Sequence, residues 1–593
     1  MDRNSAIGLT LIAVLLLVYF NFFAPEPPKE TPAMITTEVT DSVTQTLPAA
    51  TDTIHANGLL GAVQAGEEKL TKIETNDLIV TFTNKGGVIQ SLELKKFKTY
   101  YKAPLLLVSP NSNQFKLNST FEGKDLDLYS IFYEVETRNG AGDTAFVTFT
   151  SRIAEGKTLK QAYAIPSNGY VINYSISSTG LAESLNGDRL TLEWIDHIPN
   201  QEKDIAPVRT NSTVTWYTAK EDFNKISEGS SDAESEIIAE PLKWVAIKQM
   251  FFSNAIIAKN AFTGGEVSTS VNMADPAVVK TAKARLFIPK ADVISNTAKF
   301  ELFFGPNQYE LLTSITDGFG DNLALGWPPV SWVSKFVIIP IFHFLESFIS
   351  NYGIIIMIMV IIIKLILTPL SYSSYLGMAK MRLLKPELDL IKEKNGDNMT
   401  QAQQDQMKLY QQAGVNPFAG CIPLLLQMPI LFAMFYFFPV SVELRQQPFL
   451  WADDLSTYDS IAQLPFTIPF YGDHVSLFVL LMTASTLIYT WQNNQLTSVT
   501  GPMKSMSLIM PVIFLFVLNS FSAGLSFYYF VSNLVTFAQQ AIIKRFVDED
   551  KIKQVMEDHK KKIATGTGTK SKFMTKLGEA MKASEEARKK ARN

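Results

Sequence analysis

The sequence predicts an α-helical polytopic membrane protein, with an N-terminal anchor and a five-helix C-terminal core, that also carries a large extracytoplasmic all-β sandwich domain. Six apolar segments have the length of a membrane span, and five of them crowd into the C-terminal part of the chain. The region before those five is rich in short alternating patterns that are typical of strands. Charge separates the parts as well, because region 24–332 holds 27 Lys and Arg against 37 Asp and Glu, whereas the tail 544–593 holds 15 against 8.

The apolar segments are expected to be membrane helices. The first, 1–23, is interpreted as an uncleaved N-terminal anchor because no small-residue cleavage site follows it; a cleaved signal peptide is the alternative. The other five predicted helices are 352–375, 418–439, 474–492, 507–521 and 525–543. The last two are separated only by Ser522-Ala523-Gly524, which predicts a tight turn at the membrane edge.

Lys and Arg in the loops predict the orientation of these helices. The predicted helical hairpin 376–417 holds six Lys and Arg, whereas the loop 440–473 holds one against five acids. Loops rich in Lys and Arg stay in the cytoplasm. The hairpin and the basic tail 544–593 are therefore predicted to be cytoplasmic, and helix parity places both termini there and the large domain outside.

The region between the first two predicted membrane helices divides into three parts. Residues 24–70 are rich in Pro, Thr, Ala and Glu, which predicts a flexible tether. Residues 71–326 are predicted to form a two-sheet β-sandwich, with Lys85-Gly86-Gly87 as a turn. Residues 327–350 are predicted to form an amphipathic interfacial helix on the outer membrane surface, on which His343 takes a surface position. Strand-like alternation is clearest at 78–83, 88–94, 145–150 and 170–176.

Nothing in the sequence predicts catalysis, a cofactor or a metal site. Gly318-Phe319-Gly320-Asp321 matches a pattern of intramembrane aspartyl proteases, but it lies outside every predicted span and is interpreted as a turn. The only cysteine, Cys421, cannot form a disulfide within the chain and is expected to be a packing residue.

One cation lies within a predicted membrane helix. Lys364 follows Tyr352 by twelve residues, which places it about 18 Å into the membrane at 1.5 Å per residue. A lysine there costs about 2.5–3.5 kcal/mol, and no predicted span contains an acid to neutralise it. This predicts a water-filled cavity; a snorkelling lysine is the alternative. Other polar residues in the spans support a cavity: Thr368, Gln427, Thr483, Thr486, Thr490, Asn519, Ser532, Asn533, Thr536 and Gln539.

The cytoplasmic segments contain further helical patterns. The hairpin is expected to bend at Pro386, to begin its second helix at a Thr400 cap and to end it at Gly414. Its methionines suit variable apolar partners but also serve as core filler. The basic tail is either a solvated disordered end or a contact for phosphate groups of ribosomal RNA or anionic lipid.

Four stretches of the C-terminal half resemble the YidC/Oxa/Alb membrane protein insertase family, in particular its Gram-negative form. They are 368–370 with 378–382, 415–430, 441–445 and 510–536. The resemblance implies a β-supersandwich outside the membrane and a hydrophilic groove open to cytoplasm and lipid. Lys364 then occupies the position of a groove cation that is usually Arg. The expected groove residues are Lys364, Gln427, Tyr528, Tyr529, Asn533 and Thr536, and those of the hairpin are Met378, Lys380, Met381 and Arg382.

The expected function is therefore a membrane protein insertase and chaperone of the inner membrane, with a periplasmic domain. The resemblance implies nascent membrane proteins as clients, and the Sec translocon, ribosomes and the signal-recognition-particle pathway as partners, in contact with membrane lipid. Two other hypotheses remain at this point. One is a solute or anion transporter that uses Lys364, and the other is an envelope protein whose β-sandwich binds or processes carbohydrate.

Overall fold

The computed structural model describes residues 61–396, 398–416, 422–496 and 502–565. The predicted anchor 1–23, most of the tether, Cys421 and the end of the tail lie outside these residues. The chain divides between Leu323 and Ala324 into two compact units, a β unit and a helical unit.

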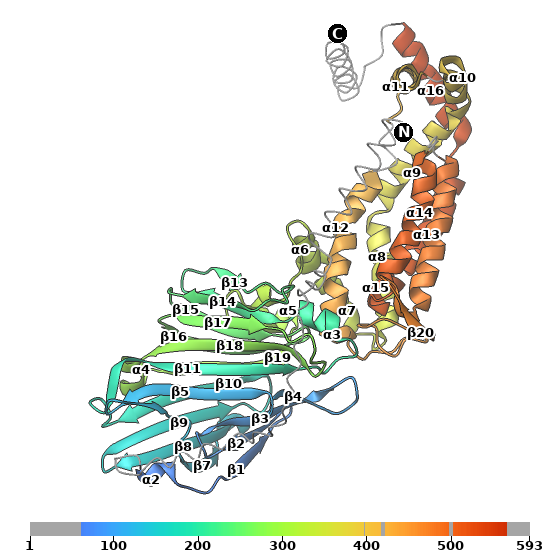
Figure 1. Ribbon diagram of the computed structural model, residues 1–593. Helices are drawn as coiled ribbons and strands as arrows, with labels where there is room; N and C mark the ends of the chain where they lie inside the picture. Colours follow the sequence, from blue (N-terminus) through green and yellow to red (C-terminus); the bar gives the residue numbers. More distant parts are fainter. Residues whose placement is uncertain (1–60, 397, 417–421, 497–501, 566–593) are drawn as a thin grey trace, which may run out of the picture. The chain divides into compact units, whose positions relative to one another are not determined.

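The β unit is built from three antiparallel sheets (Figure 1). In spatial order, the four-stranded sheet contains β1 (Leu70–Glu74), β2 (Leu78–Thr83), β3 (Val88–Lys98) and β4 (Pro104–Val108). The nine-stranded sheet contains β13 (Phe223–Lys225), β12 (Thr213–Thr218), β15 (Leu242–Lys248), β16 (Phe252–Phe262), β19 (Lys299–Pro306), β10 (Val171–Thr179), β9 (Lys157–Ile165), β8 (Ala145–Ala154) and β7 (Glu134–Asn139). The six-stranded sheet contains β14 (Glu234–Ile238), β17 (Gly265–Ser270), β18 (Val278–Pro289), β11 (Leu185–Pro199), β5 (Asn113–Phe121) and β6 (Lys124–Asp127).

The predicted all-β domain is confirmed, with a third sheet beyond the two that alternation predicted. Alternation identifies a strand but not its partner, because pairing depends on residues far away in the sequence. β11 pairs with β5 on one side and with β18 on the other. The predicted turn between β2 and β3 is present, and Gly86 and Gly87 both have positive φ.

One end of the nine-stranded sheet is buried on both faces. Every residue of β12 is buried, and Trp244 of β15 packs edge-on against Phe319. Phe319 begins a 3-10 turn, Phe319–Asn322, that follows α5 (Tyr309–Ile315). A Cβ on Gly318, which has φ +70°, would lie 2.2 Å from the Tyr217 ring. The Gly-x-Gly-Asp match is thus a packed turn, as the sequence predicted.

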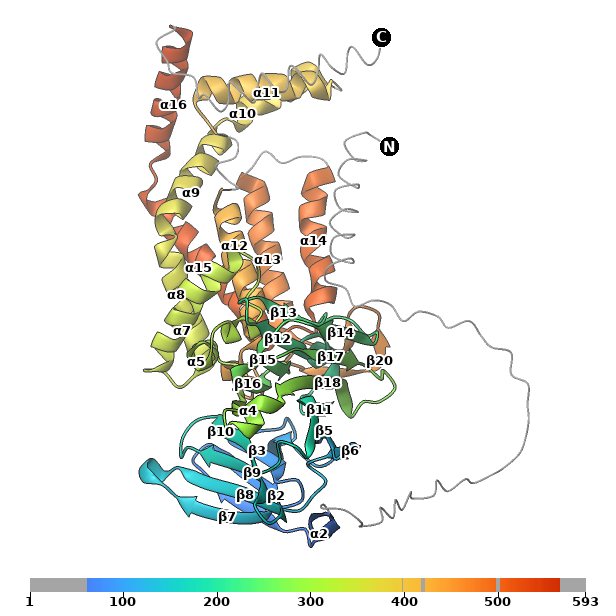
Figure 2. The ribbon, with the colours of Figure 1, turned by 90° about the vertical axis from the view of Figure 1, so that its left-hand side faces the viewer.

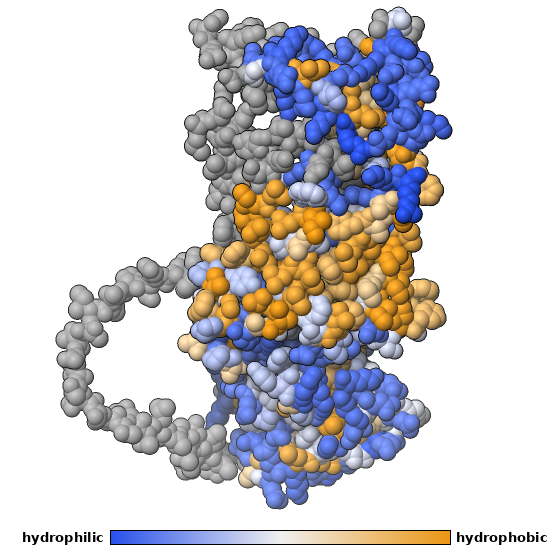
Figure 3. All heavy atoms as spheres, turned by 90° about the vertical axis from the view of Figure 1, so that its right-hand side faces the viewer, coloured by the Kyte–Doolittle hydropathy of each residue, from blue (hydrophilic) through white to orange (hydrophobic). Residues whose placement is uncertain are grey.

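The helical unit contains the five apolar segments of the C-terminal half, a β-hairpin and the helices of regions 376–417 and 544–565 (Figure 2). Its longer helices are α8 (Tyr352–Ile366), α9 (Thr368–Leu383), α10 (Lys385–Asn395), α11 (Met399–Ala413), α12 (Ile422–Phe437), α13 (Leu477–Leu496), α14 (Pro502–Leu518), α15 (Ala523–Phe546) and α16 (Glu549–Ala564). The hairpin is β20 (Ala462–Ile468) with β21 (Gly472–Val475). Figure 3 shows a hydrophobic band on the helical unit. Ile509, Val512 and Phe516 of α14 have exposed side chains.

The first span of the core is broken. Among the described residues no single helix is both long and apolar enough to cross a membrane, whereas α8 and α9 together meet those requirements with a bend of 62°. The sequence predicted one helix over 352–375. The break falls at Leu367, because Pro369 has no N–H to continue the hydrogen-bond ladder of α8 and sits in the first turn of α9.

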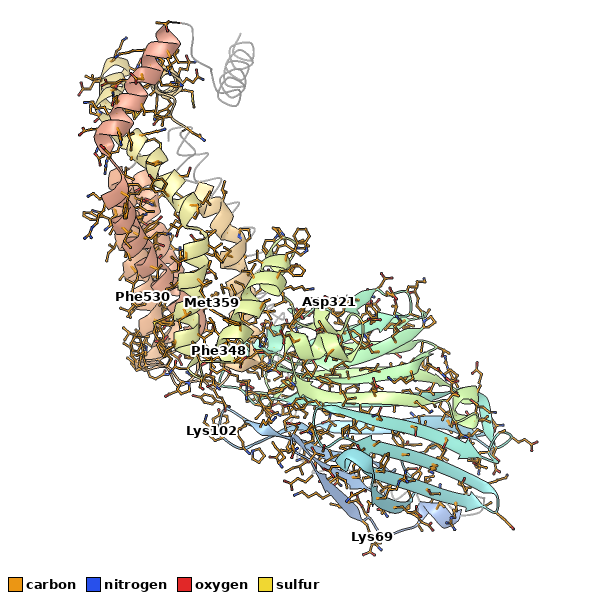
Figure 4. The ribbon with its side chains drawn as sticks, turned by 180° about the vertical axis from the view of Figure 1, so that it is seen from behind. Lys69, Lys102, Asp321, Phe348, Met359 and Phe530 are labelled. Carbon is orange, nitrogen blue, oxygen red and sulfur yellow. The ribbon has the colours of Figure 1, made fainter. Side chains whose placement is uncertain are left out.

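The interfacial segment forms α6 (Val330–Val333), a π-helical turn (Ser334–Ile338) and α7 (Ile339–Glu346). Its inner face is buried through Ile338, Ile339 and Phe342. Its outer face is aromatic rather than polar, with Phe336 and Phe348 each 75% exposed; Figure 4 labels Phe348 just beyond the end of α7. Aromatic side chains on such a face suit the level of the lipid headgroups.

The described part of the tail contains a helix, α16. The sequence left open whether the tail is a solvated disordered end or a contact for phosphate groups, and the residues after 565 lie outside the described part of the chain. α16 packs against α9 and α11 through Ile552 and Met556, which join a buried cluster with Met378 and Met381. The second hairpin helix, α11, is capped by the side chain of Asn398, which accepts from the Gln401 N–H, and not by Thr400. Gly414 ends α11 with φ +63°, as predicted.

Candidate functional site

Lys364 lies in the last turn of α8, just before the break in the span. Its residue is 8% exposed, and its Nζ donates to Oε1 of Gln427 on α12 at 3.3 Å. Met359, earlier on α8, is fully buried, and Figure 4 shows it on the helix beside α15, which carries Phe530. The structure therefore brings together two of the predicted groove residues, the ammonium of Lys364 and the amide of Gln427.

Gln539 of α15 holds the broken end of α8. Its Nε2 lies 3.2 Å from the Lys364 carbonyl oxygen and 2.8 Å from Oγ1 of Thr368. The Thr368 hydroxyl donates to the same carbonyl oxygen at 2.9 Å. These contacts satisfy backbone that the break would otherwise leave without partners in an apolar surrounding. Sequence reasoning gave Gln539 no role beyond general polarity, since only the tertiary packing brings it to the backbone of Lys364.

A second polar group links α13 and α15. Nδ2 of Asn533 lies 2.9 Å from the hydroxyls of both Ser485 and Thr486. The hydroxyl of Thr536 donates to the Ser532 carbonyl oxygen within α15 at 2.7 Å. Within the described residues, neither Asn533 nor Thr536 forms a hydrogen bond with Lys364, so this group is a separate polar layer between helices.

Tyr528 and Tyr529 lie nearer the beginning of α15. Tyr528 is buried against Phe438, with ring centroids 5.9 Å apart, and the Tyr529 hydroxyl donates to the Leu431 carbonyl oxygen at 3.3 Å. Tyr528 and Gln539 are eleven positions apart on α15, a distance of about 16 Å along the helix axis. The six predicted groove residues therefore occupy successive levels of the unit and do not form one contact cluster.

Residues 454–476 make polar contacts around the ends of α13 and α14. Asp459 accepts from the backbone N–H groups of Leu477 and Phe478 and so caps α13. Asn519 is fully buried, and its amide donates to the carbonyl oxygens of Tyr471 and His474. The expectation that Asn519 lines a wet cavity is therefore wrong, because its hydrogen bonds tie the loop to α14.

His343 is also more than a surface residue. Its Nδ1 lies 3.1 Å from Oε2 of Glu346, and the hydroxyl of Tyr352 donates to Oε1 of the same carboxylate. The hydrogen bond with His343 holds the pKa of Glu346 below its usual value. This network joins α7 to the first residue of α8.

Of the four predicted hairpin residues, two point inward. Met378 and Met381 are 9% and 8% exposed and pack in the cluster with α16. Arg382 pairs with Glu549 of α16, and Lys380 lies partly exposed on α9. Lys560 of α16 pairs with Glu387 of α10 at 2.6 Å. The tail helix α16 is therefore joined to α9 and α10 by apolar contacts and ion pairs.

Comparisons with known proteins cover nearly the whole chain. The family model of the 60Kd inner membrane protein matches residues 344–551, and that of the YidC periplasmic domain matches residues 70–341. A membrane protein insertase YidC of Amoebophilus asiaticus is 42% identical over 592 residues, which cover 98% of this chain and 99% of the relative. One of Cytophaga hutchinsonii is 44% identical over 615 residues, covering 99% and 98%. The solved structure of an active YidC insertase with its first transmembrane domain resolved is 18% identical over 90% of this chain and 99% of that chain, with a TM-score of 0.31.

Proposed function

The chain belongs to the family of YidC membrane protein insertases, and from this premise we propose that Lys364 marks the site at which polar groups of client proteins enter the membrane. As a member of this family the chain is an insertase of the inner membrane with a periplasmic β domain, and not an enzyme. No comparison supports the transporter hypothesis.

The observation that carries the proposal is a buried cation that lacks a counter-charge. Within the described part of the chain, the ammonium of Lys364 has one hydrogen-bond partner, the neutral amide oxygen of Gln427. A buried cation without an anion is unfavourable, and in membrane proteins such groups face a cavity or a pathway. An arriving carboxylate or polar backbone group of a client would relieve this cost.

The mechanism is electrostatic. A client carboxylate that crosses the apolar core alone costs roughly 2.5–3.5 kcal/mol. Beside Lys364 it would exchange part of its water for a fixed positive charge, and the cost of its passage would fall. Gln427 would orient the ammonium, and Gln539 would hold the α8 backbone that carries it. Because lysine is a point charge without the planar fork of arginine, the site requires charge and not bidentate geometry.

Replacement of Lys364 tests this proposal. In cells depleted of their own insertase, Lys364→Ala should lower insertion of a small client with acidic residues at least tenfold, whereas Lys364→Arg should retain most of it. Lys283→Ala, which removes an exposed lysine of β18 in the β unit, is the control for loss of charge alone. Wild-type insertion by Lys364→Ala would contradict the proposal.

The partners implied by the family resemblance belong to the same proposal. The Sec translocon, the ribosome and the signal-recognition-particle pathway would meet the chain at the hairpin and at the exposed lysines of α16, among them Lys551, Lys553 and Lys561. Contacts to ribosomal RNA phosphates weaken steeply with salt. Co-sedimentation of the full chain with ribosomes should therefore fall as salt rises, and fall further when these three lysines are replaced by Gln.

We also propose that both termini face the cytoplasm, in keeping with six Lys and Arg in 376–417 against one in 440–473. Protease added to intact spheroplasts should cleave the β unit and spare an epitope placed after Asn593. Loss of that epitope in intact spheroplasts would show that the C-terminus faces outward and would contradict this orientation.

A further inference from the structure

An apolar groove lies at the break of the bent span. It has a volume of about 610 Å³ and is lined by the end of α8, the start of α9 and the last turns of α15. Leu365, Pro369 and Tyr372 form one wall, and Ile542 and Phe546 form the other. Leu365 and Ile542 are 65% and 57% exposed, and Phe546 is 76% exposed.

The groove results from the bend itself. α9 turns away from the axis of α8 by 62°, and α15 continues past the bend to Phe546. The only polar lining side chain that comes from the break, Thr368, already bonds to the Lys364 carbonyl oxygen and to Gln539. The groove therefore offers an occupant apolar surface and almost no hydrogen bonds.

A positively charged residue, Arg545, lies at the rim of the groove. Arg545 follows Ile542 by three residues and so lies on the same side of α15. It is exposed, and within the described residues it forms no ion pair. Lys544, its neighbour, is also exposed but lies on the opposite side of the helix from the groove. The groove thus combines an apolar floor with one positive charge at its edge.

The position along α15 matches the level of lipid headgroups. The 24 residues of α15 span about 36 Å, slightly more than a hydrocarbon core of about 30 Å. Arg545, at its end, therefore lies at the polar boundary on the side where Lys and Arg are abundant. Basic pockets between membrane helices at this boundary suit anionic lipid headgroups.

We propose that this groove is a binding site for an anionic phospholipid of the cytoplasmic leaflet. One acyl chain lies against Leu365, Ile542 and Phe546, and the phosphate lies at the Arg545 guanidinium. The bound lipid fills the outer side of the bend and keeps α9 turned away from α8. Charge complementarity favours a phospholipid over a client helix here, because every anionic phospholipid brings a phosphate to the guanidinium at this boundary, whereas a client helix does so only if it carries an acid at this level.

Native mass spectrometry of the full chain tests the site. Wild-type protein released from detergent should retain phosphatidylglycerol in preference to phosphatidylcholine. Arg545→Gln should lower phosphatidylglycerol retention about fivefold, as expected for one basic residue near the surface, while Lys544→Gln should leave it unchanged. Ile542→Trp, which fills the groove, should lower retention of both lipids.

Three results would overturn the proposal. The first is equal retention of the two lipids by the wild-type chain. The second is an equal loss from Arg545→Gln and Lys544→Gln, which would indicate a diffuse attraction to the whole helix end. The third is a photo-crosslinker at position 542 that reacts with client protein and not with phospholipid, which would make the groove a protein-binding surface.

Discussion

The two units differ in the partners that they provide for buried lysines. In the β unit, Lys248 has a side chain that is 3% exposed and pairs with Oε1 of Glu228 at 2.5 Å. Lys280 is 1% exposed and donates to the Glu228 carbonyl oxygen at 2.7 Å. In the helical unit, Lys364 is similarly buried, but its one hydrogen-bond partner among the residues that the structure describes is the amide of Gln427. The first two cations are satisfied by the protein itself, and the third is not.

The two buried lysines of the β unit have a structural role, because Glu228 is a partner of both. Burial favours the neutral acid at Glu228, but the ammonium groups of Lys248 and Lys225 outweigh it and lower the pKa of Glu228 to about 2. That carboxylate holds the connection from β13 to β14 against the sheet. No such carboxylate accompanies Lys364 among the described residues, so its charge remains available for another molecule.

Breaking the paired site should have the largest effect on stability. Glu228→Gln leaves Lys248 buried without its counter-charge, which should lower the free energy of unfolding of the β unit by about 3–5 kcal/mol. Denaturant unfolding of the full chain, followed by Trp fluorescence, measures this loss. Glu240→Gln breaks the exposed pair with Lys220 and should have no measurable effect. Equal effects of the two variants would contradict the structural role of Glu228.

Asp196 of the β unit is a buried group of the opposite charge to the three lysines. It is 1% exposed on β11, and its Oδ2 accepts a hydrogen bond from the amide of Asn254 at 3.3 Å. Burial raises its pKa to about 7, against opposing hydrogen bonds from Asn113 and Asn254. Because the folded-state pKa lies above the unfolded value, the stabilisation is complete below pH about 4 and is lost as the pH rises toward 7.

The expected pH dependence is a fall in unfolding free energy of up to about 1.4 kcal/mol per pH unit between pH about 4 and 7. Asp196→Asn should flatten this part of the stability curve, and Asp232→Asn, at an exposed position, should leave it unchanged. A wild-type stability that rises over this range would show that Asp196 is ionised in the folded chain.

Gln539→Leu should have a smaller effect. It removes the donor to the Lys364 carbonyl oxygen and to Thr368, and hydrogen bonds between membrane helices contribute about 0.6–1.7 kcal/mol. We expect a fall of this size in the stability of the full chain in detergent, with a several-fold loss of insertion. Gln540→Leu removes the neighbouring amide, for which no hydrogen bond is found within the described residues. If both variants behave alike, Gln539 does not position Lys364.

Much of this arrangement could be predicted from the sequence. Alternation located β2, β8 and β10, and hydropathy located the apolar helices of the core. Lys364 could be identified because a cation in an apolar run is rare. Gln427 could be identified because it lies in a stretch that resembles the family and falls on a groove position of that family. These features are local, so composition and spacing within a short window are enough to find them.

The remaining features depend on contacts between distant residues. The break at Leu367 is stabilised by Gln539, which lies on a helix far along the chain. The sequence of α16 contains a signal for an amphipathic helix, because Ile552, Met556 and His559 recur at helical spacing. The abundant lysines around these residues obscured that signal. Its docking also requires Gly414, where a Cβ would lie 2.9 Å from the His559 ring.

A double-mutant cycle between insertase and client measures whether Lys364 interacts with the charge of the client. Insertion rates would be measured for a client with one translocated Asp and for its Asn form, each with the wild-type chain and with Lys364→Gln. If the unpaired ammonium acts on client charge, the Asp client should lose at least fivefold more than the Asn client when Lys364 is replaced. Equal losses for both clients would show that Lys364 does not interact with the charge of the client and would contradict the account.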